Sequence, residues 1–280
     1  MYPPVDPIIV EIGPLTLRWY GLLMMTAILV GAWVASQQVK RQGDNPDKLW
    51  DMLLWVLIPA LIGARLYYVF IQSPRTDQGI GRYLSNPAEI LQIWGGGIHI
   101  FGAFIAGSVA LLLYARWQRL PALKFLDAIA LALPLAQAIG RWGNFINQEL
   151  YGPPTTLPWG LRIDPQHRLP PYNNLAAYPE STRFHPLFLY ESLWNFIGFA
   201  LLFWISRRFE SQLKEGDILL LYLIWYPLGR FFIEFLRTDS WFFPGTPFNV
   251  VHILCFAAVV SAVTILYLRH RRNSQLQRKG

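Results

Sequence analysis

The stretch LRWYGLLMMTAILVGAWVASQQ, residues 17–38, is long and apolar enough to cross a bilayer as a helix. A membrane-spanning helix needs about 20 mostly apolar residues. Arg18 is the only charged residue in this stretch, and Lys40 and Arg41 follow directly after it. The whole chain of 280 residues is 54% hydrophobic and only 15% charged, which excludes an ordinary soluble globule. The sequence therefore predicts an integral membrane protein.

Seven such apolar stretches predict an all-α protein with seven transmembrane helices, forming a single membrane domain over residues 1–280. The predicted spans are 17–38, 49–71, 98–114, 125–139, 187–205, 218–236 and 250–268. The fourth span is short and contains Pro134, but without it the charged loops would no longer alternate between the two sides. Asp6 and Glu11 precede the first span, which is the reverse of a cleavable signal peptide, so we expect that span to be retained.

Lysine and arginine residues gather after every second predicted span, and cytoplasmic loops are the ones that retain positive charge. These clusters hold more than half of the 24 basic residues: Lys40, Arg41, Lys48, Arg116, Arg119, Lys124, Arg207, Arg208, Lys214, Arg269, Arg271, Arg272, Arg278 and Lys279. We therefore expect the amino terminus outside and a basic tail, 269–280, in the cytoplasm. A small extracytoplasmic cap, 140–186, is expected between spans four and five. The net charge of +7 is thus a topology signal and predicts no nucleic-acid partner.

Ionisable side chains at membrane depth are costly and usually functional. Seven candidates are present: Arg65, Arg141, Glu149, Glu191, Arg230, Glu234 and Arg237. With a rise of about 1.5 Å per residue, Arg141 and Arg230 lie roughly 20 Å above the cytoplasmic ends of their spans, and Arg65 roughly 25 Å. Three arginines in the outer half predict a site for a phosphate such as a phospholipid headgroup. The alternative is that Arg230 pairs with Glu234 at i and i+4, and that Arg65 reaches the interface.

The segment GRWGNFINQELYG, residues 140–152, brings polar groups to the end of the fourth span. Glycine lets the backbone approach a ligand closely, while Asn144 and Glu149 can hold hydroxyl groups or orient the arginine. The glycine triplet 95–97, followed by Gly102, suits either a tight loop or the packing of two helices. We interpret 140–152 as part of a binding site.

Few residues are suited to acid–base or metal chemistry. His99 and His185 are the histidine candidates for an acid or base near neutral pH. The single cysteine, Cys255, excludes an intramolecular disulfide and a zinc site built from several thiolates. The HExxH and GxSxG motifs are missing from the sequence, so we expect neither a metalloprotease nor a serine hydrolase.

The segment at 140–152 resembles the signature of the prolipoprotein diacylglyceryl transferase family. Further blocks follow the family's order: RWYGLL from Arg18, GARLYYV from Gly63, a glycine-rich block from Trp94, HPLFLYE from His185 and YPLGRFFIEFLR from Tyr226. The resemblance implies that a diacylglyceryl group passes from phosphatidylglycerol to the cysteine thiol of a preprolipoprotein lipobox, forming a thioether and releasing glycerol phosphate. It also implies a multi-pass protein of the bacterial inner membrane that needs no cofactor and no metal.

Matching positions carry the family's residue roles onto this chain. The resemblance implies that Arg141, Asn144, Glu149 and Gly152 are essential signature residues and that Arg230 is the second essential arginine. We predict that four residues act in catalysis: Arg141, Arg230, Glu149 and His99. Substrate binding is assigned to Arg141, Asn144, Gly152, Arg230, Tyr20, Tyr226, Glu234 and Arg65.

One position departs from the family. A histidine considered as the catalytic base usually stands where this sequence has Phe101, and His99 lies two residues earlier. On a helix, two residues turn a side chain by about 200 degrees, so His99 does not automatically replace that base. Either another group accepts the proton, or the histidine is not chemically indispensable.

A transporter or flippase for an anionic lipid or solute is the alternative function, because it would also need arginines at membrane depth. Such a protein must open to both leaflets, whereas these arginines cluster near one side. A structural partner in a membrane complex would leave the polar segment 140–152 unexplained.

Overall fold

The computed structural model describes residues 1–3, 6–13, 15–72, 79–92 and 96–276. Trp94, Gly95, Arg278 and Lys279, which enter the sequence argument, lie outside these residues. The chain divides into two compact units, Met1–Val34 with Leu126–Gly280 (unit 1) and Ala35–Phe125 (unit 2).

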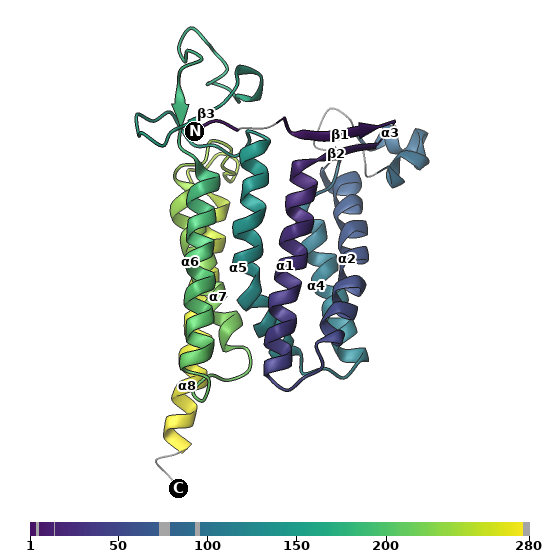
Figure 1. Ribbon diagram of the computed structural model, residues 1–280, viewed down its shortest axis with the longest axis vertical. Coiled ribbons are helices and arrows are strands. Elements are labelled where there is room, and N and C mark those ends of the chain that lie inside the picture. The colour runs from purple at the N-terminus through teal and green to yellow at the C-terminus, as the bar shows by residue number, and fades with distance from the viewer. Residues whose placement is uncertain (4–5, 14, 73–78, 93–95, 277–280) are drawn as a thin grey trace. The chain divides into compact units, whose positions relative to one another are not determined.

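Among the described residues, seven long helices account for most of the chain (Figure 1). They are α1 (Trp19–Arg41), α2 (Asp47–Tyr67), α4 (Ile100–Trp117), α5 (Ala122–Ile146), α6 (Leu187–Arg208), α7 (Asp217–Glu234) and α8 (Val250–Leu276). The shorter elements are the π-helix Tyr68–Gln72, α3 (Gly79–Ser85), and the 3₁₀ segments Pro87–Leu91 and Pro165–His167. Helices α1 and α5 each pass through a boundary between the two units.

Within the described residues, six helices have the length and apolar composition to cross a membrane. They are Trp19–Arg41, Asp47–Ile71, Ile100–Trp117, Ala122–Ile146, Leu187–Arg208 and Val250–Arg271. Helix α7 corresponds to the sixth predicted span, but its 18 residues include Asp217, Arg230 and Glu234. Six apolar helices make this a multi-pass membrane protein, while the full count of seven spans stays a prediction.

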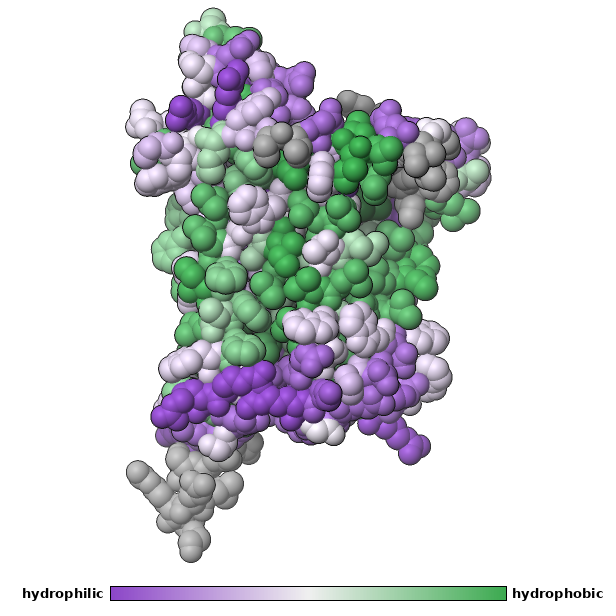
Figure 2. Space-filling view, viewed as in Figure 1, coloured by the Kyte–Doolittle hydropathy of each residue, from purple (hydrophilic) through white to green (hydrophobic). Residues whose placement is uncertain are grey.

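Large apolar side chains lie exposed along the middle of the helices. In unit 1, Phe196 on α6 is 56% exposed and Phe256 on α8 is 67% exposed. Figure 2 shows hydrophobic surface over the middle of α6 and its neighbours and hydrophilic residues near the ends. Because an aqueous protein rarely tolerates such continuous apolar surface, these faces fit a lipid environment.

Helix α5 is longer than the sequence predicted. The predicted span ended at residue 139, but the helix continues to Ile146, and Pro134 lies inside it without ending it. The first seven residues of the predicted cap, 140–146, are therefore helical. A proline removes only one intrahelical hydrogen bond, and neighbouring helices in a membrane protein compensate for that loss.

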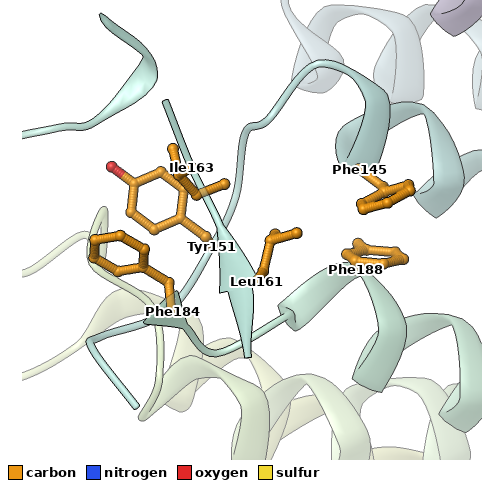
Figure 3. Packing of buried hydrophobic residues seen from close by; sticks show 6 residues of the cluster. All are labelled: Phe145, Tyr151, Leu161, Ile163, Phe184 and Phe188. Atoms are coloured by element: carbon orange, nitrogen blue, oxygen red, sulfur yellow. The ribbon is translucent and has the colours of Figure 1, made fainter. Parts of the chain in front are cut away.

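The region after α5 folds around a small core that is closed by two short strands. Strand β3 (Leu161–Arg162) pairs antiparallel with β4 (Arg183–Phe184). Their buried side chains join a cluster that reaches the ends of α5 and α6, and Figure 3 shows its six members: Phe145, Tyr151, Leu161, Ile163, Phe184 and Phe188. Arg168 organises the loop beneath by donating to the carbonyls of Ile163, Tyr178, Pro179 and Glu180.

The amino-terminal segment adds β-structure that an all-α prediction did not include. Strands β1 (Ile8–Ile12) and β2 (Leu15–Arg18) form an antiparallel hairpin directly before α1. Met1 joins the edge of the cap, because its amino group donates to Gly160 O at 2.7 Å and its carbonyl accepts from Arg162 N at 2.8 Å. These pairings link residues more than 150 positions apart, so local sequence patterns do not predict them.

Helices α6 and α7 pack through a pair of stacked tryptophans. The rings of Trp194 and Trp225 lie 4.4 Å apart, and each indole N–H donates to the other residue's carbonyl at 3.1 Å. A Cβ at Gly198 or Gly229 would collide with these indoles, so glycine is needed at both positions. This contact fixes the rotation of α6 against α7.

The other ends of the unit 1 helices are held by buried carboxylates. Asp127 on α5 accepts from Gly216 N at 2.5 Å and from Leu219 N at 2.8 Å. Asp217 is fully buried and accepts from Lys214 N at 2.8 Å, while His270 Nε2 lies 2.7 Å from its carboxylate. Helix α8 continues to Leu276, so the predicted tail 269–280 begins as helix rather than as free chain.

In unit 2, α2 packs on α4 through small residues. A Cβ at Gly63 would collide with Gly102 O, and a Cβ at Gly102 would collide with Gly63 O. Gly107 makes the same kind of close approach to Ala60. Gly102 and Gly107 are therefore helix-packing glycines, one of the two alternatives for the glycine-rich block.

Candidate active site

The polar segment predicted at 140–152 forms the last turn of α5 and the loop that follows. Arg141 and Asn144 stand at i and i+3, so their side chains lie on one face of the helix. Gln148 and Leu150 have positive φ values of 54°, which turn the chain back on itself. This turn places Glu149 beside the helix end, where its N–H donates to Asn144 O at 3.0 Å.

Asn144 connects the arginine to the glutamate. Its Oδ1 accepts from Arg141 Nη1 at 3.4 Å, and its Nδ2 donates to Glu149 Oε1 at 2.8 Å. Asn147 Nδ2 donates to the same carboxylate oxygen at 3.4 Å. Asn144 is buried, whereas the Glu149 side chain is exposed. The amide thus orients a charged pair that remains open to a ligand.

A second carboxylate links two arginines. Glu191 on α6 is buried and pairs with Arg141 through Oε2 and Nη2. Its other oxygen lies 3.9 Å from Arg237 Nη1. Arg237 in turn donates to both oxygens of Asp239, from Nε at 2.8 Å and from Nη2 at 2.5 Å. Partial burial alone would raise the pKa of the Asp239 carboxyl group. The bidentate contact with Arg237 and the charge of that arginine outweigh this effect and lower the pKa.

Arg230 and Glu234 form the intrahelical ion pair that the i and i+4 spacing predicted, with Nη2 and Oε2 separated by 2.6 Å. Glu234 is only 2% exposed, and its Oε1 accepts from Asn249 Nδ2 at 2.9 Å. The pair does not use all the donors of the arginine. Arg230 Nη1 is buried and has no hydrogen-bond partner among the described residues. Arg230 therefore has a donor available for a ligand.

A small cavity of about 10 Å³ lies between α6 and α7 beside Arg230 and has room for about one water-sized group. Its lining residues are Glu191, Trp194, Asn195, Tyr226, Arg230 and Ile233. Glu191 also pairs with Arg141, so the cavity adjoins the polar cluster at the end of α5. The cavity and the cluster together form one candidate site, built from α5, α6 and α7.

Two other predicted residues lie in tight backbone contacts of unit 1. Tyr20 on α1 packs over Gly143, where an added Cβ would lie 2.7 Å from Cδ2 of the ring. Gly152 is packed just as closely, since a Cβ there would lie 2.9 Å from both His185 Cβ and Leu236 O. The glycines of the signature segment thus allow close packing around the site.

Arg65 lies in unit 2 and is surrounded by backbone carbonyls. It is 7% exposed and lies near the rings of Tyr68 and Tyr83. Each of its three guanidinium nitrogens donates to carbonyl oxygens at 2.6–2.9 Å, those of Glu89, Ile90, Gly96 and Gly97. This arrangement favours a role in holding the loop before α4, similar to that of Arg168 in the cap, over phosphate binding.

His99 also lies in unit 2, as the N-cap residue of α4. Its Nδ1 accepts from Phe101 N at 3.3 Å, and its ring stacks on Tyr67 at 4.8 Å. A neutral imidazole that accepts at Nδ1 carries its proton at Nε2, where it is a donor and not a base. The geometry therefore favours helix capping by His99.

His185, the other histidine candidate, contacts a tyrosine. Its Nδ1 lies 3.1 Å from Tyr190 OH, and that hydroxyl accepts from Trp159 Nε1 at 3.1 Å. In the described part of the chain, the side chains of His, Cys, Asp and Glu form no group of three or more that could hold a metal ion.

Of the predicted site residues, unit 1 brings together Arg141, Asn144, Glu149, Tyr226, Arg230 and Glu234. The sequence reasoning missed three polar residues of this region: Asn195, Asp239 and Asn249. Asn195 and Asn249 are neutral amides, and a search for ionisable residues overlooks them. Screening the predicted spans for amides as well as charges would have found Asn195.

Known proteins resemble this chain along almost its full length. A family model described as prolipoprotein diacylglyceryl transferase matches residues 7–268. A protein of Chloroflexus aggregans named phosphatidylglycerol–prolipoprotein diacylglyceryl transferase is 41% identical over 97% of this chain and 92% of its own length. Proteins of the same name from Trichormus variabilis and Synechococcus elongatus are 43% and 47% identical, covering 97% and 84% of this chain and 93% and 78% of their own lengths.

Proposed function

The chain belongs to the prolipoprotein diacylglyceryl transferase family, and we propose that it transfers the diacylglyceryl group of phosphatidylglycerol to the lipobox cysteine of preprolipoproteins. The observation that carries this proposal is the match over residues 7–268 together with the arginine, asparagine and glutamate cluster of α5–α7. The products are a thioether-linked lipoprotein precursor and glycerol phosphate.

Arg141 and Arg230 bind the headgroup phosphate in this proposal. Each guanidinium has five N–H donors and stays charged at any physiological pH, so pairing with one carboxylate leaves donors for phosphate oxygens. Arg230 Nη1, which lacks a partner among the described residues, supports this assignment. Glu191 and Glu234 hold the two guanidinium groups in place.

The same positive charge assists the reaction itself. A cysteine thiol has a pKa of about 8.5, and nearby guanidinium groups increase the thiolate fraction at neutral pH. The thiolate attacks the carbon of the diacylglycerol unit that carries the phosphate. A C–S bond forms as the C–O bond between that carbon and the phosphate breaks. The bonding electrons leave with the phosphate, whose charge the arginines stabilise. Asn144 and Glu149 orient Arg141 and the lipid, with Tyr226 and Tyr20 beside them.

The proposed topology follows from the charge distribution. In this topology the protein crosses the bacterial inner membrane seven times. Its amino terminus lies on the outer side of that membrane and its carboxyl terminus lies in the cytoplasm. The segment that follows α5 then forms an extracytoplasmic cap. A donor lipid in the outer leaflet and an exported lipobox peptide would meet at this side.

Mass spectrometry of a lipobox peptide tests the function. Purified protein, phosphatidylglycerol and the peptide should give a peptide heavier by one diacylglyceryl group, with one glycerol phosphate released per modified peptide. A peptide whose cysteine is replaced by serine is the matched control and should stay unmodified. An unmodified cysteine peptide together with lipid moved between leaflets would support a transporter instead.

A further inference from the structure

Asn195 is a buried polar residue that the proposed mechanism does not use. It lies on α6 and is 2% exposed. Its Oδ1 has no hydrogen-bond partner among the described residues. An unpaired amide oxygen inside a membrane protein is costly, and native structures rarely leave one without a role.

The position of Asn195 indicates where a group that donates a hydrogen bond to its side-chain oxygen would bind. The residue lines the small cavity of about 10 Å³ together with Arg230, whose Nη1 is the other unpaired buried atom of this cavity's lining in the described chain. The lining residues thus include one unpaired acceptor, Oδ1, and one unpaired donor, Nη1. A cavity of this volume has room for about one group the size of a water molecule.

The two free atoms differ in what they require. A phosphate oxygen only accepts, so it satisfies Arg230 but leaves Asn195 Oδ1 unpaired. An ammonium headgroup only donates, so it satisfies Asn195 but brings a like charge to Arg230. A hydroxyl group donates and accepts at the same time. It is the lipid headgroup chemistry that satisfies both atoms.

We propose that Asn195 and Arg230 bind a hydroxyl of the glycerol headgroup, and that Asn195 selects donor lipids whose headgroup carries a hydroxyl. Because Arg230 Nη1 carries two N–H groups, it can donate one to the phosphate and the other to this hydroxyl. The inference rests on the proposed function and adds to it a residue that determines headgroup specificity. A single hydroxyl of the glycerol that leaves with the phosphate enters the cavity between α6 and α7, which Tyr226 also lines. A bound water would satisfy the same two atoms, and the experiment separates the two cases.

The test compares two donor lipids in mixed micelles with a lipobox peptide: phosphatidylglycerol, and phosphatidylpropanol, which has the same phosphate and three headgroup carbons but no hydroxyl. Wild-type protein should prefer phosphatidylglycerol in kcat/KM by about tenfold or more, because the analogue leaves two buried groups unpaired. Asn195→Leu should lower kcat/KM about tenfold for phosphatidylglycerol and less than threefold for phosphatidylpropanol. Asn195→Ala is the second variant, with the same expectation.

Ser206→Ala is the matched control, because Ser206 is another buried polar residue of α6 whose hydroxyl already donates to Phe203 O at 2.8 Å. It should keep the wild-type preference. The proposal is overturned if wild-type protein uses both lipids equally, which would indicate a water site. It is also overturned if both Asn195 variants lower kcat/KM by the same factor for the two lipids. If wild-type protein modifies the peptide with neither lipid, the proposed function itself fails.

Discussion

Glu149 illustrates how single residues shape the site. The carboxylate is exposed, but it accepts from the buried Asn144, which contacts Arg141. A glutamine at this position keeps the shape but loses the charge, and it can present an amide nitrogen to the Asn144 donor. Glu149→Gln should therefore lower kcat/KM for peptide modification by about tenfold, since a charge-assisted hydrogen bond is lost. Asn147→Ala, which removes only the 3.4 Å contact to the same oxygen, should change it less than threefold.

An unchanged rate in Glu149→Gln, with the protein folded, would show that this carboxylate does not orient the site. Equal losses in the glutamine variant and in the Asn147 control would point to a general disturbance of the loop.

Asp239 makes a pH-dependent contribution to stability. Its pKa is lowered in the folded protein by Arg237, despite partial burial. The ionised carboxylate therefore stabilises the fold at any pH above the pKa of the unfolded state, which is about 3.9. This contribution is lost as the pH falls through the lower pKa of the folded state. Because the side chain is 41% exposed, the contribution is at most about 1 kcal/mol. Thermal unfolding in detergent should show wild-type protein more stable than Asp239→Asn at about pH 6, and the difference should vanish near pH 2.

A difference that stays constant over this pH range would contradict the lowered pKa. Asn174→Ala, in the cap loop, removes no ionisable group and is the control, so its stability difference from wild type should stay constant over this pH range.

Residue roles were only partly predictable from the sequence. Arg141, Arg230 and Glu234 stand out because charge at membrane depth is rare, and the structure brings them into one region. Arg65 has the same sequence signal, yet its guanidinium is surrounded by carbonyls. Those carbonyls belong to residues 24 to 32 positions further along the chain, and sequence patterns do not show such partners.

At the scale of an element, His99 is expected to stabilise the start of α4. Removing an N-cap side chain costs about 0.5–2 kcal/mol. His99→Ala should lower the melting temperature of the purified protein, and His99→Asn should restore it, because asparagine is a good N-cap acceptor. Both variants should modify the lipobox peptide at rates within about threefold of wild type, since capping affects stability more than chemistry. Loss of turnover in both, with lipid binding intact, would show instead that His99 is the base.

The helices were more predictable than the connections between them. Each of the seven apolar stretches contains a helix, since helix formation in a membrane follows from apolar length alone. The predicted end of α5 was seven residues too early. The polar residues 140–146 suggested a loop, but they continue the helix. The pairs β1–β2 and β3–β4 were missed, since β3 and β4 have only two residues each and depend on tertiary contacts.

At the scale of the whole molecule, the orientation in the membrane can be tested with single cysteines. Cys255→Ala removes the only native thiol. Leu175→Cys then adds one to the cap, where Leu175 is 42% exposed, and Gln212→Cys adds one to the exposed turn between α6 and α7. A membrane-impermeant maleimide should label position 175 in intact spheroplasts, and position 212 only after permeabilisation. Labelling of both from the same side would mean that α6 does not cross the membrane and would contradict the proposed topology.

The central claim is that guanidinium groups hold the lipid phosphate during transfer, and Arg230→Lys tests it most directly. The lysine keeps a positive charge beside Glu234 but lacks the planar fork of donors. The measurement is the initial rate at which a lipobox peptide gains one diacylglyceryl group, with the melting temperature followed in parallel. We expect a rate about a hundredfold or more below wild type at a nearly unchanged melting temperature. A wild-type rate in the lysine variant would contradict the phosphate clamp.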